Sequence, residues 1–225
     1  MINRELQNRI LSSIIIIPIA IFFILQGSIF FAFFLSIFFL ASSYEWIKMN
    51  KKDTLKIIGI LYLFFASFSA YLLREKFPLG IFILILIICI FTDLGGYIFG
   101  KIFKGPKLTK ISPKKTYAGA IGSFILSLIA AIIFTKYTNI GSLAHINLSL
   151  LIGNNQELDN MFFLFILSIS FISQIGDLII SYFKRIAKVK DTGKLLPGHG
   201  GLLDRVDGII FAIPTSYLLF NFFIS

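Results

Sequence analysis

Residues 181–207 read SYFKRIAKVKDTGKLLPGHGGLLDRVD, and we call them the polar segment. They lie between two long apolar runs, at about residues 161–183 and 208–224, each near the ~20 residues that a helix needs to cross a bilayer. Charged side chains and irregular backbone are costly to expose to lipid, so the polar segment has to lie at a membrane surface. The rest of the chain can be interpreted relative to that surface.

The composition is that of an integral membrane protein. Hydrophobic residues make up 57% of the chain and charged residues 14%, against about 45–50% and roughly 25% in soluble domains. The single cysteine, Cys89, lies in an apolar run, so we expect a small buried side chain and no intrachain disulfide. The net charge of +10 sits mostly in short loops between apolar runs, which indicates membrane topology rather than nucleic-acid binding.

Seven apolar runs have the length of membrane-spanning helices. We therefore predict an all-α fold, a polytopic integral membrane helical bundle with about seven transmembrane helices in a single membrane domain, residues 1–225. The first run resembles a signal peptide, but no small-residue cleavage site follows it, so we expect it to be retained. The predicted spans are at about residues 10–25, 28–47, 57–73, 79–99, 117–135, 161–183 and 208–224.

Lysine and arginine are distributed unevenly over the loops. Of 21 such residues, 18 fall on the N-terminal segment and on the loops after the second, fourth and sixth predicted spans. Because basic loops stay in the cytoplasm, we expect the N-terminus and these loops to be cytoplasmic and the C-terminus to lie outside. Residues 136–160 form either an external loop or an extra interfacial or re-entrant helix, and His145 is expected to be a solvated loop residue.

Four carboxylates lie inside or at the ends of predicted spans, namely Asp93, Asp177, Asp204 and Asp207. Ionised groups at membrane depth are costly and indicate function. At about 1.5 Å per residue, Asp177 lies roughly 10 Å below Lys184, and Asp93 roughly 12 Å below Lys101. Carboxylates with open positions suit Mg²⁺, basic side chains suit phosphate, and glycines let the backbone approach it. The combination predicts phosphoryl or nucleotidyl transfer.

The polar segment resembles the signature of the phosphatidate cytidylyltransferase (CDP-diacylglycerol synthase) family. The pattern is Ser-x-apolar-Lys-Arg, Lys-Asp-x-small, apolar-Pro-x-His-Gly-Gly and Asp-Arg-x-Asp, and every specified position matches. The matching residues are Ser181, Lys184, Arg185, Lys190, Asp191, Gly193, Leu196, Pro197, His199, Gly200, Gly201, Asp204, Arg205 and Asp207.

Further similarity lies upstream, so the resemblance covers about residues 92–207 of the 225. Residues 92–97 read Thr-Asp-Leu-Gly-Gly-Tyr, residues 111–116 read Ile-Ser-Pro-Lys-Lys-Thr, and residues 174–178 read Gln-Ile-Gly-Asp-Leu. The chain departs at residues 117–119, where Tyr-Ala-Gly stands in place of the family's usual Trp-Glu-Gly. No role is therefore carried over for that glutamate.

The resemblance implies that CTP and phosphatidate react to give CDP-diacylglycerol and pyrophosphate. It also implies Mg²⁺, held by Asp177, Asp204 and Asp207, and leaves open whether a second cation takes part. The residues expected to act in catalysis are Lys184, Arg185, Lys190, Asp191, His199 and Arg205. The expected substrate contacts are Ser112, Lys114, Lys115, Thr116, Asp93, Lys101, Gly200 and Gly201.

The expected roles of His199, Asp191 and Glu45 are as follows. Phosphatidate is already ionised, so His199 is expected to donate a hydrogen bond to a phosphate rather than to transfer a proton. Asp191 either orients a lysine or binds the metal. Glu45, next to Trp46 at the inner interface where tryptophan is common, is expected to be structural.

The expected partners are CTP, phosphatidate and the lipid bilayer, with no nucleic acid, and a homodimer is left open. The expected location is the cell (inner) membrane, with several passes and the active site facing the cytoplasm. Residues 1–90 are expected to be structural and residues 91–207 catalytic, with cytoplasmic loops at 100–116 and 184–207 and a last helix at 208–224.

Two other functions compete with this interpretation. A CTP-dependent lipid or polyprenol kinase would transfer the γ-phosphate and release CDP. An ion-coupled transporter would use the intramembrane aspartates, but it would not explain the glycine- and lysine-rich loops and would favour inverted repeats that the sequence lacks.

Overall fold

The helices follow the apolar runs of the sequence. The computed structural model describes residues 4–109, 111–138, 156–196, 198 and 200–224. Within these ranges the chain forms seven α-helices and one short 3₁₀ helix and no β-strand, which confirms the all-α prediction. The elements are α1 (Arg4–Gln26), α2 (Ser28–Met49), α3 (Asp53–Lys76), α4 (Leu79–Phe103), α5 (Tyr117–Thr138), α7 (Gln156–Ile186), η2 (Leu203–Arg205) and α8 (Ile209–Ile224).

The helices have the lengths and surfaces of a membrane bundle. Five of them, α2, α3, α4, α5 and α7, are long and apolar enough to cross a bilayer, and α1 and α8 contribute shorter apolar stretches. Large apolar side chains cover the outside, such as Ile29 at 76% exposed and Leu61 at 63%. Contact with lipid hydrocarbon is favourable for such a surface, whereas contact with water is not. The fold is therefore the predicted polytopic helical bundle.

Most of the helices extend past their predicted ends, and α4 and α7 are examples. α4 ends at Phe103 rather than near residue 99, and α7 begins at Gln156 rather than near residue 161. Hydropathy marks the part of a helix that can lie in lipid, whereas the helical backbone continues into the polar surface region. Residues 139–155, which include His145, lie outside the described residues, so the alternatives for the stretch between α5 and α7 stay open.

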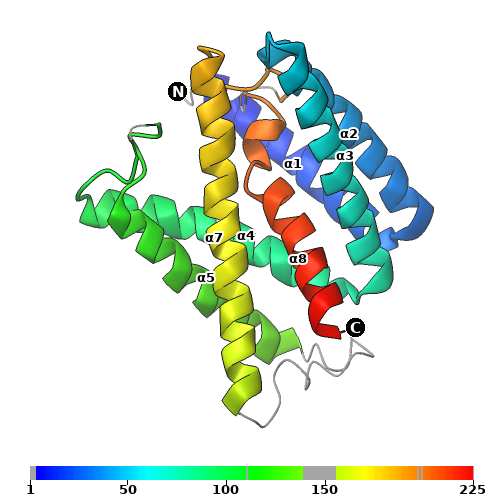
Figure 1. The fold of residues 1–225 in the computed structure, drawn as a ribbon, viewed down its shortest axis with the longest axis vertical. Helices are drawn as coiled ribbons and strands as arrows, with labels where there is room; N and C mark the ends of the chain where they lie inside the picture. Colours follow the sequence, from blue (N-terminus) through cyan, green and yellow to red (C-terminus); the bar gives the residue numbers. More distant parts are fainter. Residues whose placement is uncertain (1–3, 110, 139–155, 197, 199, 225) are drawn as a thin grey trace.

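The bundle has one end that carries most of the irregular structure (Figure 1). α2 and α3 run side by side, and α8 lies between α3 and α7. α4 and α5 form a second pair that crosses α7 at a steep angle. The start of α1 and the polar segment lie at one end of the molecule, and the chain ends at the other, in agreement with an odd number of crossings.

Glycines allow α4 and α5 to pack very closely. A Cβ at Gly95 would collide with the carbonyl of Gly122, and a Cβ at Gly119 would lie 2.7 Å from the carbonyl of Gly96. Small residues of this kind let helix backbones approach each other in membranes. The close pairing fixes where the loop between these two helices emerges.

Buried hydroxyl groups join this pair to α7. Ser123 Oγ on α5 donates to the carbonyl of Thr92 on α4 over 2.7 Å, and Thr92 Oγ1 donates to Ser170 Oγ on α7 over 2.8 Å. Hydrogen bonds between membrane helices each contribute about 0.6 kcal/mol on average. Asp93 follows Thr92 directly, so these bonds help to hold it beside α7.

Trp46 packs inside the protein rather than facing outward. Its side chain is 5% exposed, and its Nε1 donates to the carbonyl of Leu55 over 2.8 Å. Its ring meets Phe183 of α7 edge-on, with centroids 4.9 Å apart. Trp46 therefore packs α2 against α7, and its expected depth at the inner interface stays a prediction.

Candidate active site

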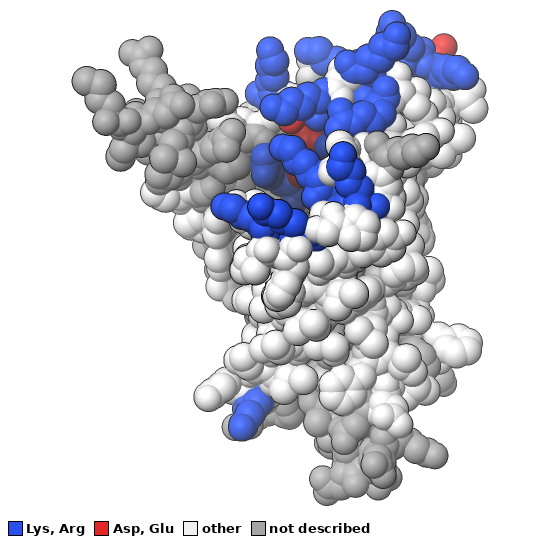
Figure 2. All heavy atoms as spheres, turned by 90° about the vertical axis from the view of Figure 1, so that its left-hand side faces the viewer, with Lys and Arg blue, Asp and Glu red and all other residues white. Residues whose placement is uncertain are grey.

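Positive charge gathers at the end of the bundle that carries the polar segment. Figure 2 shows lysine and arginine side chains clustered over this end, with acidic side chains visible between them and an almost uncharged surface below. The basic loops of the sequence thus gather at one end of the folded protein, as their uneven distribution predicts.

One face of α7 carries a column of polar side chains. Asp177, Ser181 and Lys184 are spaced four and three residues apart, so they lie on the same side of the helix. Ser181 Oγ donates to Asp177 Oδ1 over 3.2 Å. The other oxygen, Asp177 Oδ2, forms an ion pair of 2.6 Å with Lys115 Nζ from the loop before α5.

Three carboxylates converge from three parts of the chain. Asp93 comes from α4, Asp177 from α7, and Asp207 from the residues just before α8. Asp177 and Asp207 lie within hydrogen-bonding reach of each other, and Asp93 is close enough for its charge to act on both. Burial, followed by the negative charges of Asp177 and Asp93, raises the pKa of the Asp207 carboxyl well above its usual range. A cation bound beside this group would favour its ionised form.

The loop between α4 and α5 folds over this carboxylate group. It is tied to the end of α7 by Arg185, whose Nε donates to the carbonyl of Ile111 over 3.3 Å. Its last residue, Thr116, accepts a backbone hydrogen bond of 3.1 Å through Oγ1 and so caps the first turn of α5. The loop is thereby held where Lys115 meets Asp177.

The polar segment contains a tight turn. Leu196 and Gly200 exchange backbone hydrogen bonds of 3.0 and 3.2 Å across it. Gly198 and Gly200 have φ angles of 78° and 89°, in the left-handed region that residues with a Cβ rarely adopt. His199 lies outside the described residues, so its expected hydrogen bond to phosphate stays a prediction.

Asp204 is enclosed within the polar segment. Its Oδ1 pairs with Lys184 Nζ at 2.7 Å, and the two side chains are only 7% and 14% exposed. Its Oδ2 accepts from the backbone N–H groups of Thr192, over 2.8 Å, and Gly201, over 3.1 Å. Both oxygens of Asp204 are thus engaged by donors of the fold. Its expected role as a metal ligand, which would require these bonds to be exchanged, stays a prediction.

Glu45 contacts the polar segment directly, which sequence reasoning missed. Its side chain, on α2, is 1% exposed. Oε1 accepts from Leu202 N over 3.0 Å, and Oε2 accepts from Leu203 N over 2.9 Å and from Thr192 Oγ1 over 3.1 Å. The signal was available, because Glu45 is an ionisable residue near the end of an apolar run, the same reason for which the aspartates were singled out.

An open cavity of about 800 Å³ lies between the end of α2 and the polar segment. Lys48, Lys190 and Lys194 line it, together with Asp191, and none of these four forms an ion pair in the part of the chain that the structure describes. The cavity has the size of typical small-molecule sites, about 300–1,000 Å³. A phosphate-bearing ligand would meet three lysines there, beside the carboxylates of Asp191 and Glu45.

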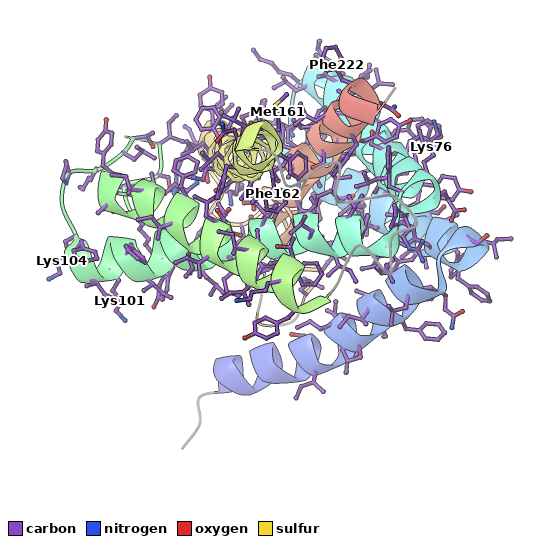
Figure 3. All side chains as sticks on the ribbon, turned by 90° about the horizontal axis from the view of Figure 1, so that it is seen from below. Lys76, Lys101, Lys104, Met161, Phe162 and Phe222 are labelled. Carbon is purple, nitrogen blue, oxygen red and sulfur yellow. The ribbon has the colours of Figure 1, made fainter. Side chains whose placement is uncertain are left out.

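Three other expected substrate contacts are Lys101, Lys114 and Ser112. The ammonium of Lys101 lies over the ring of Tyr97, 5.7 Å from its centroid, and Figure 3 shows Lys101 at the far end of α4, pointing away from α7. Lys114 is exposed, and Ser112 takes part in a turn through its N–H, which donates to Thr109 Oγ1 over 3.2 Å. The structure therefore does not bring Lys101 to the carboxylates. Arg205 and Gly200 belong to the polar segment itself.

The donor set can be tested against a metal ion. Among the described residues, no three His, Cys, Asp or Glu side chains are arranged to hold a metal by themselves. Asp177 and Asp207 nevertheless provide two neighbouring hard-oxygen donors, and the Lys115 ammonium already occupies a cation position 2.6 Å from Asp177. Mg²⁺ is usually held by one or two carboxylates, with water and substrate phosphates completing its shell. The residues fit a Mg²⁺ ion that is bound together with a phosphate ligand.

The chain belongs to the Cytidylyltransferase family, because the sequence profile of that family matches residues 54–223. Curated relatives extend the match over almost the whole chain. The chain is 32% identical to the phosphatidate cytidylyltransferase of Rickettsia conorii over 97% of its own length and 91% of that protein. It is 33% identical to the protein of the same name from Rickettsia typhi, over 96% and 92%, and 36% identical to that of Brucella melitensis, over 71% and 54%.

Replacing Asp204 with asparagine should loosen the polar segment. The change leaves Lys184 without its negative partner in a place that is 14% exposed or less, and removing one member of such a pair costs about 3 kcal/mol or more. We expect a clear fall in the thermal unfolding temperature of the purified protein. The matched control is Asp53→Asn, because Asp53 pairs with Lys56 but is 87% exposed, so its loss should change the unfolding temperature little. Equal unfolding temperatures for the two variants would contradict this account of Asp204.

Proposed function

We propose that the protein transfers CMP from CTP to phosphatidate, giving CDP-diacylglycerol and pyrophosphate. The observation that carries the proposal is the convergence of Asp93, Asp177 and Asp207 beside Lys115 and Lys184, in a membrane protein of the Cytidylyltransferase family. Carboxylates that lack sufficient positive charge, at the end of the bundle where basic side chains cluster, suit a ligand made of metal and phosphate. The names of the relatives point to the same substrate.

The chemistry is a substitution at phosphorus. An ionised phosphate oxygen of phosphatidate attacks the α-phosphorus of CTP and forms a new P–O bond. The bond between the α-phosphorus and the oxygen bridging to the β-phosphate breaks, and pyrophosphate leaves with that electron pair. The attacking oxygen carries no proton near neutral pH, so no general base is required. Positioning and charge neutralisation supply the catalysis.

Individual side chains divide this work. Lys190, in the wall of the open cavity, binds triphosphate charge, and Lys184 extends the positive charge from there toward Asp207. Lys115 keeps the Asp177 carboxylate in place through its ion pair. Asp177 and Asp207 would hold Mg²⁺, which when bound neutralises phosphate oxygens and the leaving pyrophosphate. Arg185 ties the loop before α5 to α7 at the edge of the site.

The proposal places the protein in the inner membrane of a bacterial cell, with the polar segment in the cytoplasm. The relatives are bacterial proteins, and 18 of the 21 basic residues lie on the loops at the end of the polar segment and on the N-terminal segment. Basic loops of this kind are retained in the cytoplasm. CTP is available on that side, and phosphatidate can reach the site from the bilayer.

The activity can be measured directly. Purified protein should receive CTP labelled at the α-phosphate, phosphatidate and Mg²⁺. Label should enter the lipid while pyrophosphate appears in equal amount, and a chelator of Mg²⁺ should stop both. A CTP-dependent lipid kinase would instead release labelled CDP and leave the lipid unlabelled. Absence of both lipid label and pyrophosphate would overturn the proposal.

Asp207→Asn should abolish turnover without preventing membrane insertion. Changes to residues that merely support a metal ligand cost about 10–100-fold, so loss of a ligand should cost more than about 100-fold in kcat. The control is Asp53→Asn, which removes an exposed carboxylate near the same end of the bundle and should retain full activity. An Asp207→Asn protein with normal turnover would remove Asp207 from the metal site.

The orientation can be tested with single cysteines in a Cys89→Ser background. Lys51 and Lys136 are both exposed, Lys51 between α2 and α3 and Lys136 near the end of α5. In intact cells an impermeant thiol reagent should label Lys136→Cys, whereas Lys51→Cys should be labelled only after lysis. The reverse pattern would invert the proposed topology.

A further inference from the structure

Glu45 is a buried carboxylate that the proposed reaction does not use. It lies in α2, before residue 54 where the match to the family profile begins, and is 1% exposed. In the described part of the chain no lysine or arginine forms an ion pair with it. Burying a charged group without a charged partner is costly unless hydrogen bonds compensate. Its hydrogen bonds must therefore be the reason why it is tolerated.

Every described partner of Glu45 belongs to the polar segment. Its two oxygens accept from Leu202 N over 3.0 Å, Leu203 N over 2.9 Å and Thr192 Oγ1 over 3.1 Å. The segment also leaves space for the carboxylate at two glycines, because a Cβ at Gly193 or Gly201 would collide with it. The fit is that of a receptacle for one carboxylate, built by residues 192–193 and 201–203.

Thr192 connects Glu45 to Asp204. Its Oγ1 lies 3.1 Å from Glu45 Oε2 and 3.1 Å from Asp204 Oδ2, and its N–H donates to the same Asp204 oxygen over 2.8 Å. A hydroxyl has one hydrogen to donate, so Thr192 serves one of the two carboxylates at a time. Asp204 in turn binds Lys184. Displacing Glu45 would therefore disturb a network that reaches α7.

The two points at which Glu45 holds the polar segment are next to the proposed reacting groups. Thr192 follows Lys190 and Asp191, which line the open cavity. Leu203 begins η2, four residues before Asp207. A displacement of about 1 Å in a catalytic group can cost on the order of 100-fold in rate. The flexible stem of Lys190 tolerates such a shift better than the short side chain of Asp207 does, so a shift should affect Asp207 more.

We propose that Glu45 is a positioning residue for cytidylyl transfer, acting from α2 on the polar segment through Thr192, Leu202 and Leu203. The proposal rests on the proposed function for its kinetic consequence. It also assigns α2 a part in the site, in place of the purely structural role expected for residues 1–90.

The test compares Glu45→Gln with Glu75→Gln. Glu75 also accepts a backbone hydrogen bond, from Ser28 N over 2.8 Å, but at the other end of α2. Glutamine at position 45 keeps the size of the side chain and replaces one acceptor oxygen by an NH₂ group, which cannot accept from a backbone N–H. We expect kcat to fall about 10–100-fold in Glu45→Gln, with a smaller change in KM for CTP, and to be unchanged in Glu75→Gln.

Two further measurements separate the proposed role of Glu45 from a loss of folded protein, and the second of them does not use the activity assay. Thr192→Val should lower kcat and Thr192→Ser should restore it, since serine keeps the hydroxyl. Hydrogen exchange of the Leu202 and Leu203 amides should be about tenfold faster or more in Glu45→Gln, because hydrogen bonds to a charged acceptor are among the stronger ones. If the wild-type protein is inactive with CTP and phosphatidate, the proposed function fails, while the exchange rates still test Glu45.

The proposal is overturned by either of two results. One is a folded Glu45→Gln protein with wild-type kcat or wild-type exchange at Leu202 and Leu203. The other is a loss of activity that only follows the loss of folded protein, seen as a lower unfolding temperature with unchanged kcat per folded molecule.

Discussion

The backbone N–H groups of the polar segment need hydrogen-bond acceptors on the surface of an apolar bundle, and two carboxylates supply them. Asp204 accepts from Thr192 and Gly201, and Glu45 accepts from Leu202 and Leu203. Unsatisfied backbone groups near a bilayer are costly, so this arrangement determines the path of the segment. The position of Asp207, and of the lysines that line the cavity, follows from that path.

The acidic residues thereby divide into two kinds. Glu45 and Asp204 are buried and saturated by donors from the fold, which makes them part of the framework. Asp93 and Asp177 lie near the ammonium of Lys115, whereas the charge of Lys184 acts on Asp207. Groups that repel one another in this way persist in proteins where a ligand completes their charge. The distinction rests on hydrogen-bond partners, since all five carboxylates lie in or beside apolar helices.

The second wall of the site depends on helix packing in the membrane. Gly95 and Gly122 let α4 and α5 approach each other, and hydroxyl groups near Thr92 join this pair to α7. The loop that leaves this pair is tied to α7 through Arg185 and brings Lys115 to Asp177. The groups of the candidate site are thus held on closely packed helices, which limits their movement.

The sequence by itself determined the helices, the membrane setting and the end of the bundle where the site lies. Apolar runs and basic loops are local properties, so they predict spans and charge separation without any knowledge of packing. The three converging aspartates were also found this way, because charge inside an apolar run is rare.

Only the tertiary structure decided how the acids divide: Glu45 meets Thr192 from 147 residues away, and Asp204 turns inward to Lys184. It likewise turned Lys101 away from α7 and buried Trp46. Such outcomes depend on which helix lies beside which, and that is set by contacts between residues far apart in the chain.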